Sequence, residues 1–229
     1  MCYRAAAEDI EQDHYVCWML DLPGCYSSAR NREEAMALAP SRIIAYDSWI
    51  HRHSPGSPVI DGPLEIDCVE EFEAYASEED PEYLVNALFE DDRRPLTYWD
   101  VEIGSRLLEW SRRDLLDVIE DLTAEDLNRS VKGEVRGNMR GILEHVCGAE
   151  NWYLAQFGLN VDASTLPQDI EGRLNVIRAN TRARLANLIG EDRITEHCGE
   201  GWSPRKTLRR TLWHERAHTE QLARLAASS

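Results

Sequence analysis

The second half of the chain, residues 96–229, repeats apolar residues at the spacing of an α-helix in four separate segments. Apolar side chains three or four positions apart share one face of a helix, so each segment predicts an amphipathic helix that buries this face. Loops that contain glycine or proline separate the segments. We therefore expect four helices packed as a bundle around one apolar seam. The defining positions are Val101, Leu108, Leu115 and Ile119; Met139, Ile142, Val146 and Tyr153; Ile170, Leu174, Ile177 and Leu185; and Leu208, Leu212, Leu222 and Leu225.

The first 70 residues show a different pattern, in which short β-type segments flank one helical segment. A Leu22-Pro23-Gly24 turn signal follows the first of these β-type segments. Asn31 is suited to cap a helix that starts at Arg32, and Pro40 is expected to kink or restart that helix. This half of the chain therefore predicts a small mixed domain. Its predicted strands are His14 to Leu20, Cys25 to Ala29 and Leu64 to Val69.

Two breaks divide the chain, and both contain proline. The first is Ser54–Pro58, and the second is Arg93–Pro95, which follows an acidic run. We therefore predict an α+β chain with a small α/β domain at 1–70, an acidic linker at 71–95 and an all-α four-helix bundle at 96–229.

Charge and cysteine usage limit the classes of function. The chain has 229 residues, of which 42 are acidic and 25 basic, and its formal net charge is −17. Such a field repels phosphate backbones, so we expect no nucleic-acid binding, and the few basic residues between Arg205 and Arg210 are interpreted as a solvated helix start. No apolar run is long enough to cross a membrane, and no pair of the six cysteines has Cys-x-x-Cys spacing. We expect a cytoplasmic protein with reduced thiols and no membrane partner.

Three histidines are candidate metal ligands. His214 and His218 are four residues apart, which places both rings on one face of the fourth predicted helix. His145 lies among apolar residues near the middle of the second predicted helix. Facing helices of a bundle are a usual place for a metal site, and three imidazoles suit zinc, nickel, copper or iron while leaving one coordination position open. We predict that these three residues bind a divalent transition metal, with zinc or nickel favoured.

Other interpretations of the histidines are weaker. The segment His214-Glu215-Arg216-Ala217-His218 matches the His-Glu-x-x-His signature of zinc proteases, but that chemistry needs a third ligand downstream, and residues 219–229 contain no histidine or aspartate. A single histidine on an apolar face is often an ordinary core residue, although three that converge are harder to explain in this way. Interpreted as ordinary packing or surface residues are His14, His51, His53, His197 and Cys198.

Two strings resemble the DinB-like family of metal-binding four-helix bundles. They are Gly141-Ile-Leu-Glu-His-Val-Cys-Gly-Ala-Glu150 and Leu212-Trp-His-Glu-Arg-Ala-His-Thr-Glu-Gln-Leu222, and the resemblance covers about residues 96–227. It implies a bundle with three histidine ligands, or with a glutamate replacing one of them, and relatives that include transferases and isomerases dependent on low-molecular-weight thiols. A small thiol or an electrophile would then be the substrate, and Glu150 would either support a ligand or tie two helices together.

The N-terminal residues resemble a second family, the HicB-type antitoxin domain. The resemblance is carried by Asp21-Leu-Pro-Gly-Cys25, Ser27, Asn31 and Glu33-Glu-Ala35, and it covers about residues 1–70. It implies a ribonuclease-H-like fold that acts by binding a partner. These antitoxins usually append a DNA-binding tail, whereas this chain continues into the predicted bundle.

Two functions follow from these patterns. The first is a divalent-metal-dependent enzyme of DinB-like type that transfers or hydrolyses low-molecular-weight thiol adducts. The alternative is a non-catalytic metal-binding or partner-binding protein with a HicB-like interaction module. Either is compatible with a homodimer, and the sequence assigns no catalytic residue.

Overall fold

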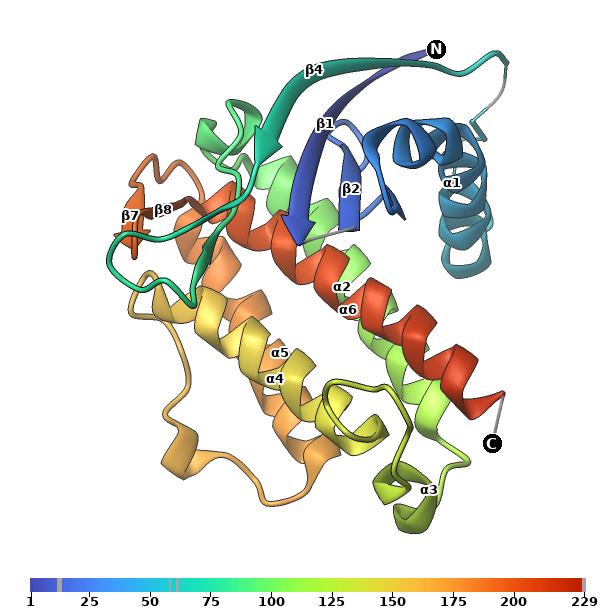
Figure 1. Cartoon of the computed structure of the whole chain (residues 1–229), viewed down its shortest axis with the longest axis vertical. Helices are drawn as coiled ribbons and strands as arrows, with labels where there is room; N and C mark the ends of the chain where they lie inside the picture. Colours follow the sequence, from blue (N-terminus) through green and yellow to red (C-terminus); the bar gives the residue numbers. More distant parts are fainter. Residues whose placement is uncertain (12–13, 58, 61, 228–229) are drawn as a thin grey trace. The chain divides into compact units, whose positions relative to one another are not determined.

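The structure is a computed structural model, drawn in Figure 1, and it confirms the predicted α+β class. By contact, the chain divides into two compact units. Unit 1 comprises Met1–Arg94 and Ile194–Lys206, and unit 2 comprises Pro95–Arg193 and Thr207–Ser229. None of the described helices is both long and apolar enough to span a membrane. The described residues are 1–11, 14–57, 59–60 and 62–227.

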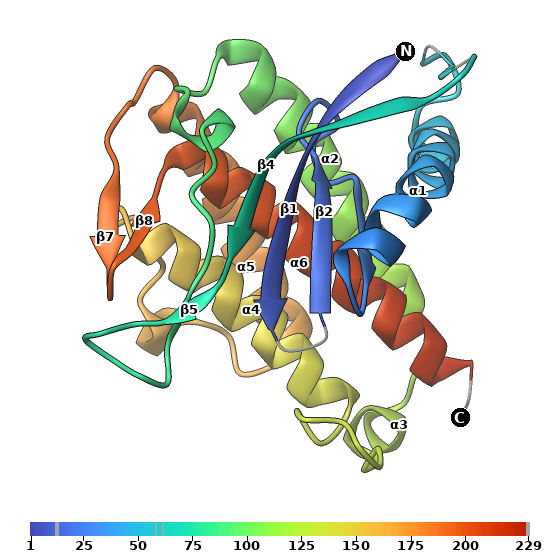
Figure 2. The same cartoon turned by 45° about the horizontal axis from the view of Figure 1, so that its top comes forward.

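Unit 1 is built on a four-stranded mixed sheet with strand order β3-β2-β1-β4. The central strand β1 is antiparallel to β2 and parallel to β4, and Figure 2 shows it between these two neighbours. The three predicted strands are confirmed as β2, β3 and β4, although β4 is longer than expected. The bounds are β1 Cys2–Glu11, β2 His14–Met19, β3 Tyr26–Ala29 and β4 Glu65–Glu73.

The sequence analysis did not predict β1, although this strand is central. Its middle is the run Ala5–Ala7, and all three side chains are fully buried. Alanine has a low preference for strands, so the run lacks the β-branched and aromatic residues that indicate one. Successive side chains of a strand point to opposite faces of the sheet, so three consecutive buried alanines indicate a strand that is covered on both faces.

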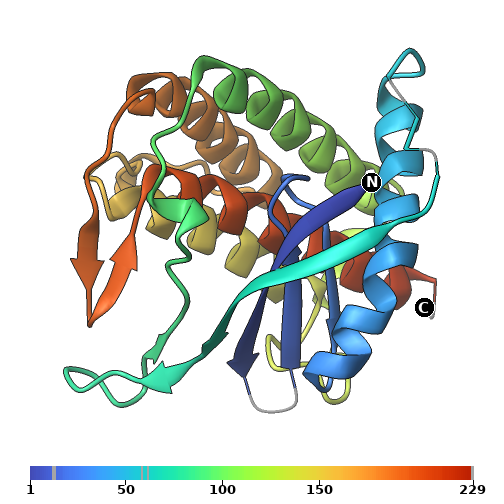
Figure 3. The ribbon, with the colours of Figure 1, turned by 90° about the horizontal axis from the view of Figure 1, so that it is seen from above.

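One long helix, α1 (Arg32–His53), completes the main part of unit 1. Asn31 caps it as predicted, because the side chain accepts a hydrogen bond from the Glu34 amide. The helix continues through Pro40, so of the two expected outcomes, a kink or a restart, the restart is excluded. One face of α1 is buried on both sides of the proline and packs on β2 and β3 (Figure 3). This packing compensates for the backbone hydrogen bond that Pro40 cannot donate. After α1, Ser54–Ser57 form the first predicted break, whereas Pro58 lies outside the described residues.

Shorter elements fill the rest of unit 1. Two hairpin-like pairs were not predicted, and in the second of them His197 is the last residue of β7. Cys198, with a φ of 50°, and Gly199, with a φ of 80°, form the turn that makes this hairpin. The remaining bounds are β5 Tyr75–Ala76, β6 Leu84–Val85, η1 Asp91–Arg93, β7 Thr195–His197 and β8 Glu200–Trp202.

The interpretation of residues 205–210 as a solvated helix start is wrong. Lys206 is fully buried, and its Nζ lies 2.6 Å from Glu200 Oε1 and 4.5 Å from the centre of the Trp202 ring. Arg210 is also buried. A buried ammonium group needs a carboxylate and carbonyl partners, and the β7–β8 hairpin supplies them. The spacing of the basic residues along the chain does not reveal these partners.

Unit 2 is mainly helical, and its four long helices confirm the four predicted segments (Figure 1). Threonine or asparagine side chains cap several N-termini, and Thr97 forms a reciprocal capping box with Asp100. The short helix α3 was not predicted, although Thr123 and Asp126 form the same box there. The bounds are α2 Tyr98–Ile119, α3 Ala124–Asn128, α4 Met139–Ala155, η2 Ala163–Thr165, α5 Ile170–Leu185, η3 Ala186–Leu188 and α6 Pro204–Ala226.

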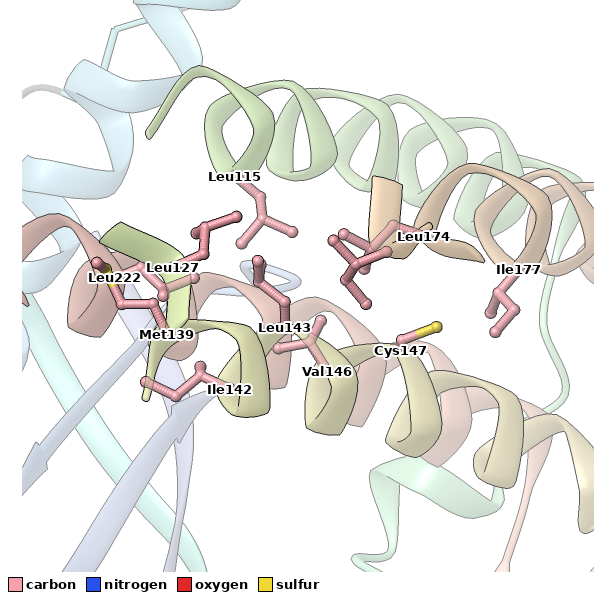
Figure 4. Packing of buried hydrophobic residues seen from close by; sticks show 11 residues of the cluster. Leu115, Leu127, Met139, Ile142, Leu143, Val146, Cys147, Leu174, Ile177 and Leu222 are labelled. Atoms are coloured by element: carbon pink, nitrogen blue, oxygen red, sulfur yellow. The ribbon is translucent and has the colours of Figure 1, made fainter. Parts of the chain in front are cut away.

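The long helices of unit 2 share one apolar core, shown in Figure 4. Leu115 of α2, Leu143 of α4, Leu174 of α5 and Leu222 of α6 are all fully buried in it. Each comes from the apolar stripe of its helix, as the sequence periodicity requires. This core holds the helices that carry the histidines.

Leu143 provides a direct test of this core. We expect Leu143→Ala to lower the free energy of unfolding by about 3 kcal/mol, because it removes buried methyl groups and leaves a cavity. Urea denaturation would measure the change. Val135→Ala is the control, since Val135 is 92% exposed and should change stability little. Equal effects of the two substitutions would contradict the described core.

Candidate metal centre

The three predicted histidines come together within unit 2. His145 projects from α4, while His214 and His218 project from consecutive turns of α6. The ring centres are 4.6 Å apart for His145 and His214, 5.1 Å for His145 and His218, and 4.5 Å for His214 and His218. One nitrogen from each ring lies within 4.8 Å of the other two, so the cluster could hold a metal ion.

The closest approach is between the Nε2 atoms of His145 and His214, which are 2.9 Å apart. Arg136 Nη2 lies 3.3 Å from the same His145 nitrogen. A guanidinium group only donates, so His145 Nε2 is an acceptor and carries its lone pair toward the cluster. Two nitrogens bound to one tetrahedral ion lie ~3.3 Å apart, so a small outward movement of these rings fits them to a metal.

The histidines are held in their neutral form. Burial lowers the pKa of His145 to about 4, and the nearby charges of Arg136 and His218 act in the same direction. Burial also lowers the pKa of His214 well below its ordinary value. For His218 burial again lowers the pKa, although a hydrogen bond to Gln221 opposes this shift. Near neutral pH the lone pairs are therefore available to a cation without competition from protons.

A short chain of hydrogen bonds orients His218. Its Nδ1 lies 2.7 Å from Gln221 Oε1, which can only accept, so Nδ1 carries the proton and Nε2 carries the lone pair. Gln221 Nε2 in turn donates to Glu134 Oε2 over 2.7 Å. Such outer contacts fix the tautomer and direction of a metal-binding ring. The position of Gln221 three residues after His218 is therefore part of the site.

Four charged side chains form a second buried cluster in the bundle, which we call the ion quartet: Arg112 on α2, Glu150 on α4, Arg178 on α5 and Glu215 on α6. All four are at least nine-tenths buried. Arg112 donates to Glu215 over 2.7 Å and to Glu150 over 2.9 Å. Arg178 donates to Glu150 over 2.8 Å and to Glu215 over 3.0 Å. Each arginine also bonds to a helix carbonyl, Leu174 O or Leu108 O.

The ion quartet decides two questions from the sequence. Glu215 receives hydrogen bonds from both arginines, so it does not face the histidine cluster as the base of a zinc protease would. Glu150 ties α4 to α2 and α5, which confirms the helix–helix tie as its role. Because Glu215 directly follows His214, its anchoring also sets the rotation of α6 that presents the histidines.

The sequence analysis missed both arginines, although their spacing signals them. Arg112 lies between Leu108 and Leu115 on the apolar stripe of α2, and Arg178 follows Leu174 by four residues on the stripe of α5. A charged residue at a core position must find a buried partner of opposite sign. Two such arginines, with Glu150 and Glu215 as available partners, would have predicted the quartet.

The remaining candidate residues lie outside the cluster. The metal-compatible group within the described residues comprises three histidines, and His14, His51, His53 and His197 are not part of it. Burial raises the pKa of the Cys147 thiol to about 11, which keeps it protonated. The pKa of Cys198 is also raised, by burial and by Glu79 and Asp80, so neither thiol is an activated nucleophile.

No protein-family model, curated protein or solved structure matches this chain. The structure shows a mixed N-terminal sheet with one long helix, a mainly helical C-terminal region and a cluster of three histidines. The two family resemblances therefore remain predictions from the motifs that carry them.

The ion quartet predicts a specific stability defect. Glu150→Gln keeps the shape of the side chain but leaves an excess positive charge in the core, so we expect a loss of about 3 kcal/mol in the free energy of unfolding. Glu102→Gln is the control, because its ion pair with Arg106 is on the surface and should contribute at most about 0.5 kcal/mol.

The stability difference between the wild-type protein and Glu150→Gln should depend on pH. Burial alone would raise the pKa of Glu150, but the guanidinium groups of Arg178 and Arg112 outweigh it and lower the pKa below the ordinary 4.5. As the pH falls, the unfolded chain therefore binds this proton first, and the stabilisation that is complete above pH 4.5 declines below it. The difference in the free energy of unfolding between wild type and Glu150→Gln should become smaller when urea denaturation is repeated at lower pH. A constant difference would contradict the ionised pair.

Proposed function

We propose that this chain binds one divalent transition-metal ion through His145, His214 and His218, and that it is a metal-dependent enzyme acting on small thiols or their adducts. The observation that carries the proposal is the convergence of three neutral imidazoles from two helices. Zinc or nickel suits this donor set best. The DinB-like motifs supply the thiol as substrate class.

The composition of the cluster favours a catalytic site over a structural one. Structural zinc sites usually have four protein ligands, whereas catalytic sites have three and keep one position for substrate. Among the described residues no cysteine, aspartate or glutamate joins the three histidines. An ion held there would act as a Lewis acid and lower the pKa of a thiol or water that reaches it.

Nearby side chains hold the site in place. The ring of Tyr153 lies 6.1 Å and the ring of Trp213 5.8 Å from the ring of His214, measured between centres. These aromatic groups shield His214 from water, and Gln221 keeps His218 Nε2 available. The chain's own contribution is thus to position three ligands and to keep them unprotonated. No side chain is assigned as a general acid or base.

A second candidate is a binding protein whose unit 1 recognises a partner. It is favoured by the Leu22-Pro23-Gly24 turn, where the Cys25 amide donates to the Leu22 carbonyl between β2 and β3. This turn and the helix after it are the elements of the HicB-like motif. A bound metal ion with no open coordination position would favour this binding function over catalysis. Light scattering would test whether the chain forms a homodimer.

Metal analysis tests the main proposal. We expect the purified protein to hold about one zinc or nickel ion per chain, and we expect His145→Gln and His214→Gln to lose it, because each removes one ligand. His14→Gln is the control, since His14 lies on β2 in unit 1. A wild-type protein that takes up no transition metal, or variants that retain it fully, would contradict the site.

The orienting role of Gln221 predicts a graded effect. Gln221→Leu removes the acceptor for His218 Nδ1 but leaves all three ligands, so metal affinity should fall about 10- to 100-fold. A competition titration with a chromogenic chelator would measure it. Gln156→Leu is the matched control, because Gln156 bonds to the Trp152 carbonyl instead. Unchanged affinity in Gln221→Leu would show that the hydrogen bond does not orient the ligand.

A further inference from the structure

One cation lies directly beside the candidate metal centre. Arg136 belongs to the loop before α4, and its Nη2 is 3.3 Å from His145 Nε2. That His145 nitrogen is in turn 2.9 Å from His214 Nε2, and the ring centres of His145 and His218 are 5.1 Å apart, so the guanidinium group borders the histidine cluster.

A metal ion would remove the partner of this arginine. The His145 Nε2 lone pair that accepts the hydrogen bond is the lone pair that a metal would take. Arg136 would then have a divalent cation as its neighbour and no acceptor in that direction. Two cations at such short range repel each other, so the exposed Arg136 side chain would either turn into solvent or bind an anion placed between it and the ion.

Within the described residues, Arg136 forms no ion pair, although the chain carries a net charge of −17. The nearest acidic side chain in its loop, Glu134, is already engaged at both oxygens. Its Oε1 accepts from the Arg136 amide over 3.0 Å, and its Oε2 accepts from Gln221 over 2.7 Å.

The loop that carries Arg136 is held in one shape. The Val131 amide donates to the Gly137 carbonyl, the Glu134 amide to Val131, and the Gly137 amide to Glu134. A side chain at Gly141 of α4 would overlap the Arg136 carbonyl oxygen, so the loop packs tightly on the helix that presents His145. The backbone of Arg136 is thus fixed beside the cluster.

We propose that Arg136 binds the carboxylate group of a small anionic substrate at the metal centre. The proposal rests on the metal site proposed above and names the chemical class that this site selects. A guanidinium group presents paired N–H donors that match a carboxylate, and a carboxylate placed between the guanidinium group and the ion offsets the repulsion of the two cations. Arg136 is a binding residue in this arrangement.

Cobalt(II) loading of the full-length protein provides the test, since its visible spectrum reports on the ligands of the ion. We expect acetate to change the spectrum with saturation, and acetamide, its neutral analogue, to have no effect. Arg136→Gln should raise the Kd for acetate at least tenfold, and Arg136→Lys, which keeps the charge without the paired donors, should raise it less. Arg140→Gln is the control, because it removes an equal charge four residues later in the chain, where the side chain bonds to Asn128 instead. It should change the Kd less than twofold.

Each other outcome is decisive. A wild-type protein that takes up no cobalt would overturn the metal site and this inference together. Cobalt uptake with the same acetate Kd in wild type and Arg136→Gln would overturn this inference alone. Equal weakening in Arg136→Gln and Arg140→Gln would show a general charge effect and overturn it too. Saturable binding of phosphate but not of acetate would overturn the carboxylate assignment. Should Arg136→Gln not fold, an unchanged Kd in Arg136→Lys would likewise overturn the paired contact.

Discussion

The ion quartet is the interaction on which the rest of unit 2 depends. Apolar side chains pack helices together but tolerate some sliding and rotation, because one methyl group substitutes for another. Two arginines and two glutamates in a dry core tolerate much less, since any shift leaves a charge without its partner. The quartet takes one residue from each long helix, Arg112, Glu150, Arg178 and Glu215, and so specifies how all four are rotated about their axes.

This constraint reaches the histidine cluster through the covalent chain. Glu215 neighbours His214, so the face of α6 that meets the arginines determines which face presents the imidazoles. Glu150 plays the same part on α4, five residues after His145. The bundle thus separates two kinds of polar chemistry along its length. The quartet is closed and balanced in charge, whereas the histidine cluster consists of neutral groups that are bordered by the charge of Arg136.

Much of this arrangement could be predicted from sequence, and the failures have physical causes. The helices of unit 2 and the shared face of His214 and His218 follow from apolar periodicity and four-residue spacing, which are local properties. The approach of His145 was expected only because facing helices of a bundle bring their side chains together. The central strand β1 was missed because Ala5–Ala7 carry no local signal, and its position depends on neighbours far along the chain. Lys206 was misinterpreted for the same reason, since its partner Glu200 belongs to an unpredicted hairpin. The contacts of Arg136 and Gln221 depend on the conformation of the loop before α4, which no periodic pattern of apolar residues predicts.

The two segments that build unit 1 lie nearly a hundred residues apart in the chain, with Pro95–Arg193 between them. Tyr83 donates to Glu200, Ser203 donates to the Asp92 carbonyl, and Lys206 donates to the Asn86 carbonyl, so the second segment satisfies groups of the first. During synthesis the ribosome releases the sheet early, but its polar partners emerge only after most of unit 2 has been made. We therefore expect unit 1 to be completed only after its second segment has been made.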